Sequence, residues 1–273
     1  MPELPEVETV ASELRKLILN KQLDTFEALW SKSFQNETDF EITGQKIVSI
    51  GRQGKYLLIT LSETYLIIHL RMTGQLIFCE DRSNADLNGH TRVLITFSDR
   101  SVLLFKDVRK FGRIIHVSNI KDKLAHVGID ALDERVTKVY FEKLLMDTSM
   151  NIKSFFLSQK FVSGMGNIYT DEVLFLAKTH PSLPANQLKK KQRHEIYHNM
   201  NTILLNSIQN MGSSISDYRD PSGKEGTNQN YFYVYGRNGL PCKKCGGVIE
   251  KIRFAGRGTH FCPKCQKVKS YQK

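Results

Sequence analysis

The chain has 273 residues, a length that suits one large domain or two modest ones with real hydrophobic cores. Hydrophobic residues make up 40% of the chain and charged residues 25%, proportions that exclude the disordered and fibrous classes of protein. Lysine and arginine number 39 against 28 acidic residues, for a net charge of +11. This excess favours a polyanionic partner, with nucleic acid ahead of an anionic membrane surface.

The sequence contains no run of the roughly 18 to 20 consecutive apolar residues that a membrane helix needs. Residues 1–6 are acidic where a secretory signal would be basic. We therefore expect a cytoplasmic protein with no membrane among its partners.

Apolar residues recur at helical spacing from Val7 to Ile18, which predicts an amphipathic helix of about three turns. From residue 45 to about residue 117 the pattern changes to short β-rich runs. The expected strands are 46–50, 56–61, 65–70, 75–78, 93–97 and 102–105, with hairpin turns at 60–64 and 98–101. Repeated antiparallel strands of this length predict a β-sandwich or barrel.

Helical periods replace the strands after residue 130, at 136–147, 152–159, 168–177 and 187–211. Between two of these helices, residues 164–167 read Gly-Met-Gly-Asn, where Asn167 suits the cap of the next helix. Such a turn exposes backbone N–H groups that can seat a phosphate. Residues 212–230 are polar and turn-rich, and we expect a mobile linker or loop there.

Two tight pairs of cysteines lie near the C-terminus, with 16 residues between the pairs. This spacing predicts a zinc ribbon, in which two knuckles hold one tetrahedral ion; chance pairs or a redox pair are the alternatives. The predicted zinc ligands are Cys242, Cys245, Cys262 and Cys265.

The segment from residue 241 to the C-terminus carries nine basic residues and one acidic residue. Two strands are expected between the cysteine pairs, at 249–254 and 259–261, which would place Arg257 at a hairpin tip between glycines. This position favours a phosphate contact over a solvated surface arginine.

Removal of Met1 would leave Pro2 with a free secondary amine, which attacks an aldehyde-like carbon to give a cationic iminium. Glu3 and Glu6 lie beside it, where burial could keep one carboxyl protonated as a general acid. By composition alone, an ordinary tail rich in proline and glutamate is the stronger interpretation.

Motifs along the whole chain resemble, in the same order, those of bacterial formamidopyrimidine-DNA glycosylase, a base-excision repair enzyme that removes 8-oxoguanine and ring-opened purines. Jointly they are highly specific. The motifs are residues 1–9 (MPELPEVET), 54–57 (GKYL), 69–74 (HLRMTG), 107–112 (DVRKFG), 164–169 (GMGNIY) with Glu172, and 256–262 (GRGTHFC).

The resemblance implies an α+β multidomain fold. A catalytic N-terminal antiparallel β-sandwich with a flanking helix would span residues 1–130, and a helix-two-turn-helix DNA-binding region residues 131–220. The zinc finger would span residues 233–267, after a linker or lesion loop at 221–232. It also implies a bacterial, nucleoid-associated monomer that holds one structural zinc ion and binds damaged double-stranded DNA.

By the same resemblance, Pro2 is the Schiff-base nucleophile at the sugar C1′ of the damaged nucleotide, and Glu3 is the acid that helps open the sugar. Lys55 is a proton donor in β-elimination, and Arg257 serves δ-elimination and phosphate binding. The enzyme would thus be a bifunctional DNA glycosylase and AP lyase that cuts the strand by β,δ-elimination.

Met72, Arg109 and Phe111 resemble the three residues that fill the gap left by an everted base and contact its orphaned partner. From the pattern alone, core packing of Met72 and Phe111 is equally favoured. The resemblance places the remaining DNA-backbone contacts at His90, Lys153 and Asn167.

Many members of the family carry a basic run before the helix expected at 152–159, but this chain has Thr-Ser-Met-Asn at 148–151 in its place. The loop at 217–230, which caps the lesion in the family, has its own sequence. Two alternatives remain: an endonuclease VIII-like enzyme for oxidised pyrimidines, which usually has glycine where this chain has Leu4, and a non-catalytic zinc-ribbon DNA-binding protein.

Overall fold

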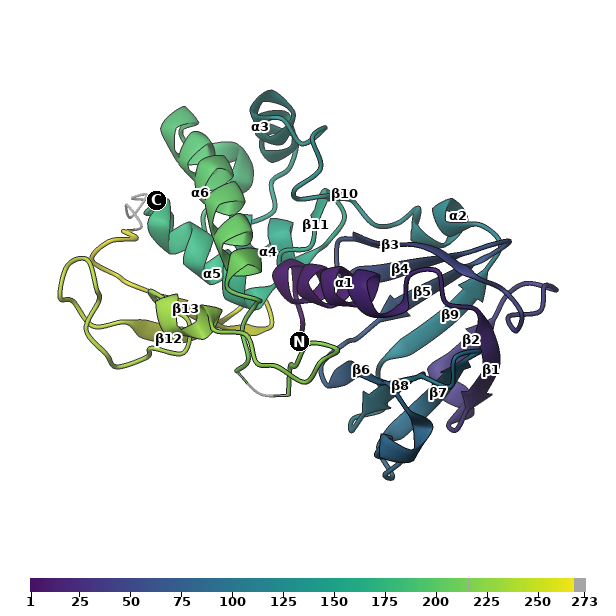
Figure 1. The fold of residues 1–273 in the computed structure, drawn as a ribbon. Coiled ribbons are helices and arrows are strands. Elements are labelled where there is room, and N and C mark those ends of the chain that lie inside the picture. The colour runs from purple at the N-terminus through teal and green to yellow at the C-terminus, as the bar shows by residue number, and fades with distance from the viewer. Residues whose placement is uncertain (216, 268–273) are drawn as a thin grey trace. The chain divides into compact units, whose positions relative to one another are not determined.

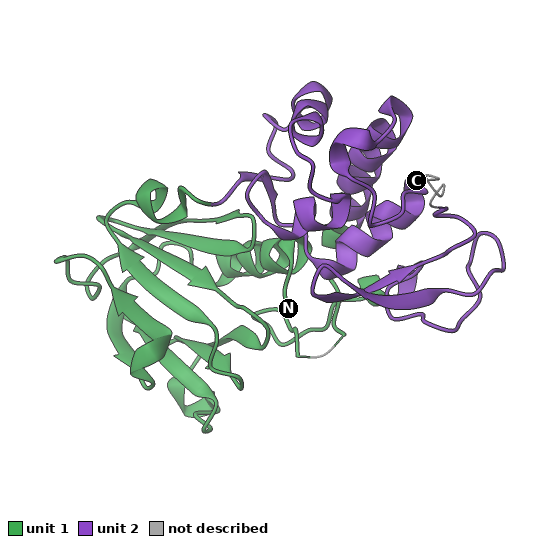
Figure 2. Cartoon of the chain, turned by 180° about the vertical axis from the view of Figure 1, so that it is seen from behind, with its two compact units in different colours: residues 1–126, 207–229 green, residues 127–206, 230–273 purple. Residues whose placement is uncertain are grey.

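The computed structural model describes residues 1–215 and 217–267. The chain forms two compact units, coloured separately in Figure 2. Unit 1 contains residues 1–126 and 207–229, and unit 2 contains residues 127–206 and 230–273. No helix of the described residues is long and apolar enough to cross a membrane.

Unit 1 begins with helix α1 (Leu4–Ile18) and then builds two β-sheets (Figure 1). One sheet has the strand order β1-β7-β8-β6, and the other has the order β2-β9-β5-β4-β3. All neighbouring strands of these sheets are antiparallel except β2 and β9, which run parallel. The strands are β1 (Leu23–Ala28), β2 (Phe34–Asn36), β3 (Ile47–Gln53), β4 (Tyr56–Leu61), β5 (Tyr65–His69), β6 (Gly74–Cys79), β7 (Thr91–Phe97), β8 (Val102–Asp107) and β9 (Arg113–Val117).

One hydrophobic core joins the two sheets and α1, since it includes Leu14 of the helix, Leu57 of one sheet and Phe105 of the other. This shared core confirms the predicted β-sandwich with its flanking helix. All six expected strands are present, and so is the hairpin turn at 98–101.

The sequence did not predict three strands of unit 1, which are β1, β2 and β9. The first two lie at sheet edges, and their side chains are mostly half-exposed or exposed, so their apolar pattern is weak. In β9 only Ile114, Ile115 and Val117 are apolar, which is too short a run to stand out.

Residues 212–229 of the predicted loop belong to unit 1, and hydrogen bonds tie this segment to α1 and β6. The Ser213 N–H donates to Glu6 Oε1 at 2.8 Å, and the Tyr218 hydroxyl donates to the Glu6 carbonyl oxygen at 3.3 Å. The Phe78 N–H donates to the Pro221 carbonyl oxygen at 2.9 Å. These bonds hold Ser213, Tyr218 and Pro221 in place, a result that the polar composition of the segment did not predict.

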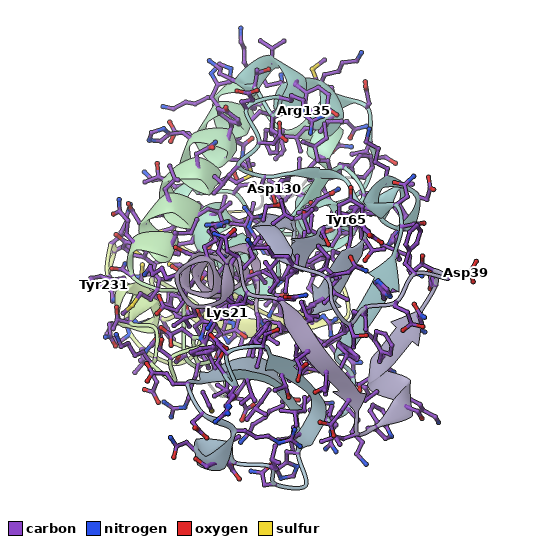
Figure 3. All side chains as sticks on the ribbon, turned by 45° about the vertical axis from the view of Figure 1, so that its right-hand side comes forward. Lys21, Asp39, Tyr65, Asp130, Arg135 and Tyr231 are labelled. Carbon is purple, nitrogen blue, oxygen red and sulfur yellow. The ribbon has the colours of Figure 1, made fainter. Side chains whose placement is uncertain are left out.

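Unit 2 is helical, as expected, and ends in a two-stranded finger. Its α5 is buried over most of its length, and Phe175 of α5 packs in one cluster with Val234, Ile249 and two of the cysteines. Tyr231 of the same unit is 62% exposed and lies at the surface in Figure 3.

The elements of this half are, in chain order, β10 (Ile129–Asp130), α3 (Lys138–Met146), α4 (Ile152–Leu157), β11 (Val162–Ser163), α5 (Asn167–Leu176), α6 (Lys190–Gln209), β12 (Glu250–Phe254) and β13 (Arg257–Phe261). Strands β10 and β11 pair in parallel, and β12 and β13 pair antiparallel. The last residues of α6 belong to unit 1. Shorter helices are α2 (Ile120–Leu124) in unit 1 and 3-10 turns at 31–33, 82–84, 185–187 and 228–231.

Candidate active site and nucleic-acid interface

The N-terminus of α1 holds the first candidate group. Pro2 is buried and Glu3, at the N-cap of the helix, is 2% exposed. The Glu3 N–H donates to Glu6 Oε2 at 2.8 Å, while Glu6 Oε1 accepts from Ser213. Both Glu6 oxygens therefore accept backbone N–H groups, and the Glu3 side chain in turn accepts the Glu6 N–H in the capping box of the helix. A buried start of this kind excludes the ordinary solvated tail.

An ion-pair bridge holds α1 against β3. Glu8 pairs with Arg15 at 3.1 Å and with Arg52 at 3.0 Å, and Arg15 Nε donates to the Ile50 carbonyl oxygen at 2.7 Å. Because Arg52 also donates to the Gly54 carbonyl oxygen, the bridge fixes the turn that carries Lys55.

Lys55 follows Gly54 in the turn between β3 and β4, where Gly54 has the positive φ of +57°. The lysine is only 6% exposed, which does not fit a solvated surface side chain. Burial, followed by the charges of Arg71 and Lys55, lowers the pKa of His69 to about 3. His69 is therefore neutral, and its Nδ1 accepts the Arg71 N–H at 2.9 Å.

Met72, Arg109 and Phe111 lie together on the surface of unit 1. An Arg109 guanidinium nitrogen lies 3.0 Å from Met72 Sδ, and the guanidinium carbon lies 5.0 Å from the centre of the Phe111 ring. Met72 is 43% exposed and Phe111 is 49% exposed, so core packing does not explain either residue. The sequence placed these residues in two separate motifs, and the fold brings them into contact.

Asp107 organises the loop that carries Arg109 and Phe111, a role that the sequence did not predict. It is 1% exposed, and its carboxylate accepts from the Thr73 hydroxyl, the Arg109 N–H and, at 2.6 Å, the Gly112 N–H. Thr73 follows Met72, so this carboxylate joins the two segments of the surface cluster. Its position as the first residue of the 107–112 motif was the available signal.

His90 is exposed and stands just before β7. Its carbonyl oxygen accepts the Asp107 N–H at 2.9 Å, which places it beside the same loop. Its imidazole is thus accessible near the Arg109 cluster.

Lys153 of unit 2 does not fit the phosphate contact that the resemblance implied. It is 0% exposed, and its Nζ lies 2.6 Å from Asp171 Oδ1. The second Asp171 oxygen accepts the His260 N–H at 2.8 Å. A fully buried lysine paired in this way does not offer its charge to DNA, because its charge is already used to join α4, α5 and the finger.

Glu172, the next residue of α5, holds the segment that leads into the finger. Its carboxylate accepts three backbone N–H groups, from Tyr233 at 2.8 Å, Val234 at 2.9 Å and Tyr235 at 2.8 Å. Burial raises the pKa of Glu172, and the three donors act against this rise. Its role in the structure is to order the chain before the zinc ligands.

The glycine turn before α5 differs from the prediction at one point. Gly166, not Asn167, caps the helix, and Asn167 is its first residue. The Asn167 side-chain amide donates to the Gly258 carbonyl oxygen at 2.9 Å, and so it contacts the finger hairpin.

The turn of the finger hairpin is shorter than expected, and the strand after it begins two residues earlier. The turn consists of Ala255 and Gly256, both with positive φ, and Arg257 is the first residue of β13, paired with Phe254. Arg257 is therefore beside the tip and not at it, although it is exposed as a phosphate contact requires.

The four cysteines converge as a zinc site. Their sulfur atoms all lie within 4.8 Å of one another, with 4.0 Å between Cys242 and Cys265 and 3.5 Å between Cys245 and Cys262. Tetrahedral zinc with bonds of about 2.3 Å places its sulfur ligands about 3.8 Å apart. The donor set and spacing fit one structural zinc ion, as predicted.

Comparisons with known proteins match the N-terminal β-sheet region, the helical region and the finger. The family model of the formamidopyrimidine-DNA glycosylase N-terminal domain matches residues 1–114, and that of its H2TH domain matches residues 127–219. A model described as a zinc finger found in FPG and IleRS matches residues 239–268.

Whole proteins match over the full chain as well. The formamidopyrimidine-DNA glycosylase of Streptococcus thermophilus strain CNRZ 1066 is 40% identical, over 98% of this chain and 100% of the relative. The crystal structure of the MutM (Fpg) protein from Thermus thermophilus has a TM-score of 0.89 at 35% identity and covers 98% of this chain and 100% of its own. Lactococcus lactis Fpg in complex with DNA containing an abasic site has the same TM-score at 37% identity and covers 97% of this chain and 100% of its own. This chain therefore belongs to the formamidopyrimidine-DNA glycosylase family of base-excision repair enzymes.

Proposed function

We propose that this protein removes oxidised purines from double-stranded DNA and then cuts the strand at the resulting abasic site. The observation that carries the proposal is the buried Pro-Glu pair at the start of α1, because a mere DNA-binding module has no need for it. Similar proteins support the substrate class: MutM, 38% identical, was solved with DNA containing carbocyclic 8-oxo-G.

In the proposed reaction, Met1 is first removed, since the Pro2 nitrogen is an amide while Met1 is attached. The free amine attacks C1′ of the damaged nucleotide, the C1′–N bond to the base breaks, and Glu3 donates the proton that opens the sugar. The resulting iminium acidifies C2′, so that loss of a C2′ proton expels the 3′ phosphate. Lys55 serves this elimination as a proton donor.

The second elimination releases the 5′ phosphate, and we assign Arg257 to hold that leaving group. Met72, Arg109 and Phe111 fill the gap left by the everted base, which an apolar wedge, an aromatic ring and a hydrogen-bonding guanidinium can do. The structural zinc ion holds the finger that carries Arg257. We propose that the enzyme acts as a monomer on the DNA of the nucleoid.

The direct test is cleavage of labelled duplexes that carry 8-oxoguanine, a ring-opened purine, thymine glycol or a preformed abasic site. We expect excision of the two purine lesions and products of β,δ-elimination. Preference for thymine glycol would favour the endonuclease VIII-like alternative. Duplex binding with no cleavage of any substrate would favour the non-catalytic zinc-ribbon alternative.

Borohydride added during the reaction tests the covalent step. It should reduce the iminium and leave DNA attached to the N-terminal peptide, while acetylation of the N-terminal amine should prevent the adduct. Pro2→Gly should retain some trapping, because a primary amine also forms an imine. Glu3→Gln should slow base removal in a folded protein. An adduct mapped to Lys55, with Pro2 unmodified, would overturn the assignment of the nucleophile.

A further inference from the structure

A group of three cations surrounds Trp30, the single tryptophan of the chain. The group includes a residue of the loop that carries Arg109 and Phe111. Lys110 Nζ and the Arg113 guanidinium carbon each lie 5.5 Å from the centre of the indole ring, and the Arg92 guanidinium carbon lies 6.0 Å from it. Three positive side chains from two segments of unit 1 thus converge on one aromatic ring.

Hydrogen bonds to the backbone hold this group in place. Arg92 Nε donates to the Asp107 carbonyl oxygen at 2.8 Å, and the Trp30 N–H donates to the Arg92 carbonyl oxygen at 3.1 Å. Arg113 donates to the carbonyl oxygens of Lys110 and Gly112 at 3.0 and 2.7 Å. The arrangement is therefore built by the fold and is not a chance meeting of surface lysines.

None of the three cations is neutralised within the part of the chain that the structure describes. Their side chains form no ion pair with any described acidic residue. In contrast, Lys106 and Lys123 of the same unit pair with Asp86 and Glu37. An indole face attracts cations without cancelling their charge. Arg92 is only 7% exposed and supports the group from below, whereas Lys110 is exposed and Arg113 half-buried, so these two cations keep positive charge available for an anion.

The backbone of Lys110 supports a functional role for this position. Lys110 has a φ of +60°, a left-handed conformation that residues other than glycine rarely adopt. The residue is exposed and sits between Arg109 and Phe111. The loop thus presents Lys110 outward at the cost of local strain.

We propose that Lys110 and Arg113, positioned on Trp30 by the buried Arg92, form a phosphate-binding site for the DNA strand opposite the lesion. This inference rests on the proposed function, in which Arg109 contacts the orphaned base. Lys110 is the next residue, so we assign the site to the phosphates of the strand that carries that base. The site adds affinity and fixes the register of the duplex without reading its sequence.

The test uses full-length zinc-loaded protein and a duplex with a tetrahydrofuran abasic analogue, with binding measured at several salt concentrations. Lys110→Gln should lower the slope of log K against log salt by about 0.9, the value of one lost phosphate contact. Lys110→Arg should retain the slope. Lys121→Gln, on α2 beside Asp122, is the matched control and should not change it.

Two further measurements locate the site. Trp30 emission should change on titration with the duplex, and it reports on this place because the chain has no other tryptophan. Neutral methylphosphonates are placed one at a time in the strand opposite the lesion, next to the orphaned base. At one of these positions the substitution should abolish the difference in salt slope between wild type and Lys110→Gln. An unchanged slope for Lys110→Gln, or an effect confined to methylphosphonates in the lesion strand, would overturn the proposal. Wild-type excision of 8-oxoguanine separates this outcome from failure of the proposed function.

Discussion

Truncation of Phe111 to alanine should separate base eversion from the later chemistry. A fully buried phenylalanine contributes roughly 1.5 to 3 kcal/mol to the free energy of unfolding. The Phe111 ring is 49% exposed, so its truncation should remove about half of that contribution. The cost to stability is thus about 1 kcal/mol. In the DNA complex the same ring replaces lost base stacking, which is worth about 1 to 3 kcal/mol.

The expected result is a loss of about 5-fold to 150-fold in excision of 8-oxoguanine from a duplex. Cleavage at a preformed abasic site should fall less, because no base has to be pushed out of the stack. Met72→Ala should act in the same direction. Single-turnover cleavage of both substrates, with enzyme in excess, measures the two losses separately.

Phe40→Ala provides the control, since Phe40 is also in unit 1 and 48% exposed but has no part in the proposed site. It should leave both reactions near their wild-type rates. Equal losses on the two substrates for Phe111→Ala, or the same loss for Phe40→Ala, would refute the assignment of Phe111 as a gap-filling residue.

Other substitutions test unit 2. Cys245→Ala should release zinc, measured by elemental analysis, and abolish duplex binding, because a small ribbon has too little core to fold without its ion; active protein without zinc would contradict this. Arg257→Ala should lower the slope of log K against log salt by about 0.9 at unchanged zinc content. Unchanged affinity and δ-elimination would make it an ordinary surface residue. Asp171→Asn removes the charge that pairs with the buried Lys153 and should cost about 3 to 5 kcal/mol in urea unfolding. A change below about 1 kcal/mol would show that the ion pair does not hold the unit together.

The sequence alone determined the features that depend on local pattern or on spacing. The helix after residue 3 and the six strong strands follow from hydrophobic periodicity, and the zinc site follows from thiol spacing, because four thiolates can meet only if two knuckles bring them together. Edge strands β1 and β2 were missed because a half-exposed strand lacks a clear apolar pattern.

Only the tertiary structure decided which side chains are buried and which meet. Lys55 and Lys153 both look like solvated lysines in sequence, but both are buried, and Lys153 pairs with Asp171 on another helix. Met72 and Phe111 are apolar residues that pattern alone would place equally well in the core, and they are exposed because Asp107 fixes their loops at the surface. Contacts between segments distant in the chain depend on the packing of the whole unit, and local sequence carries no record of that packing.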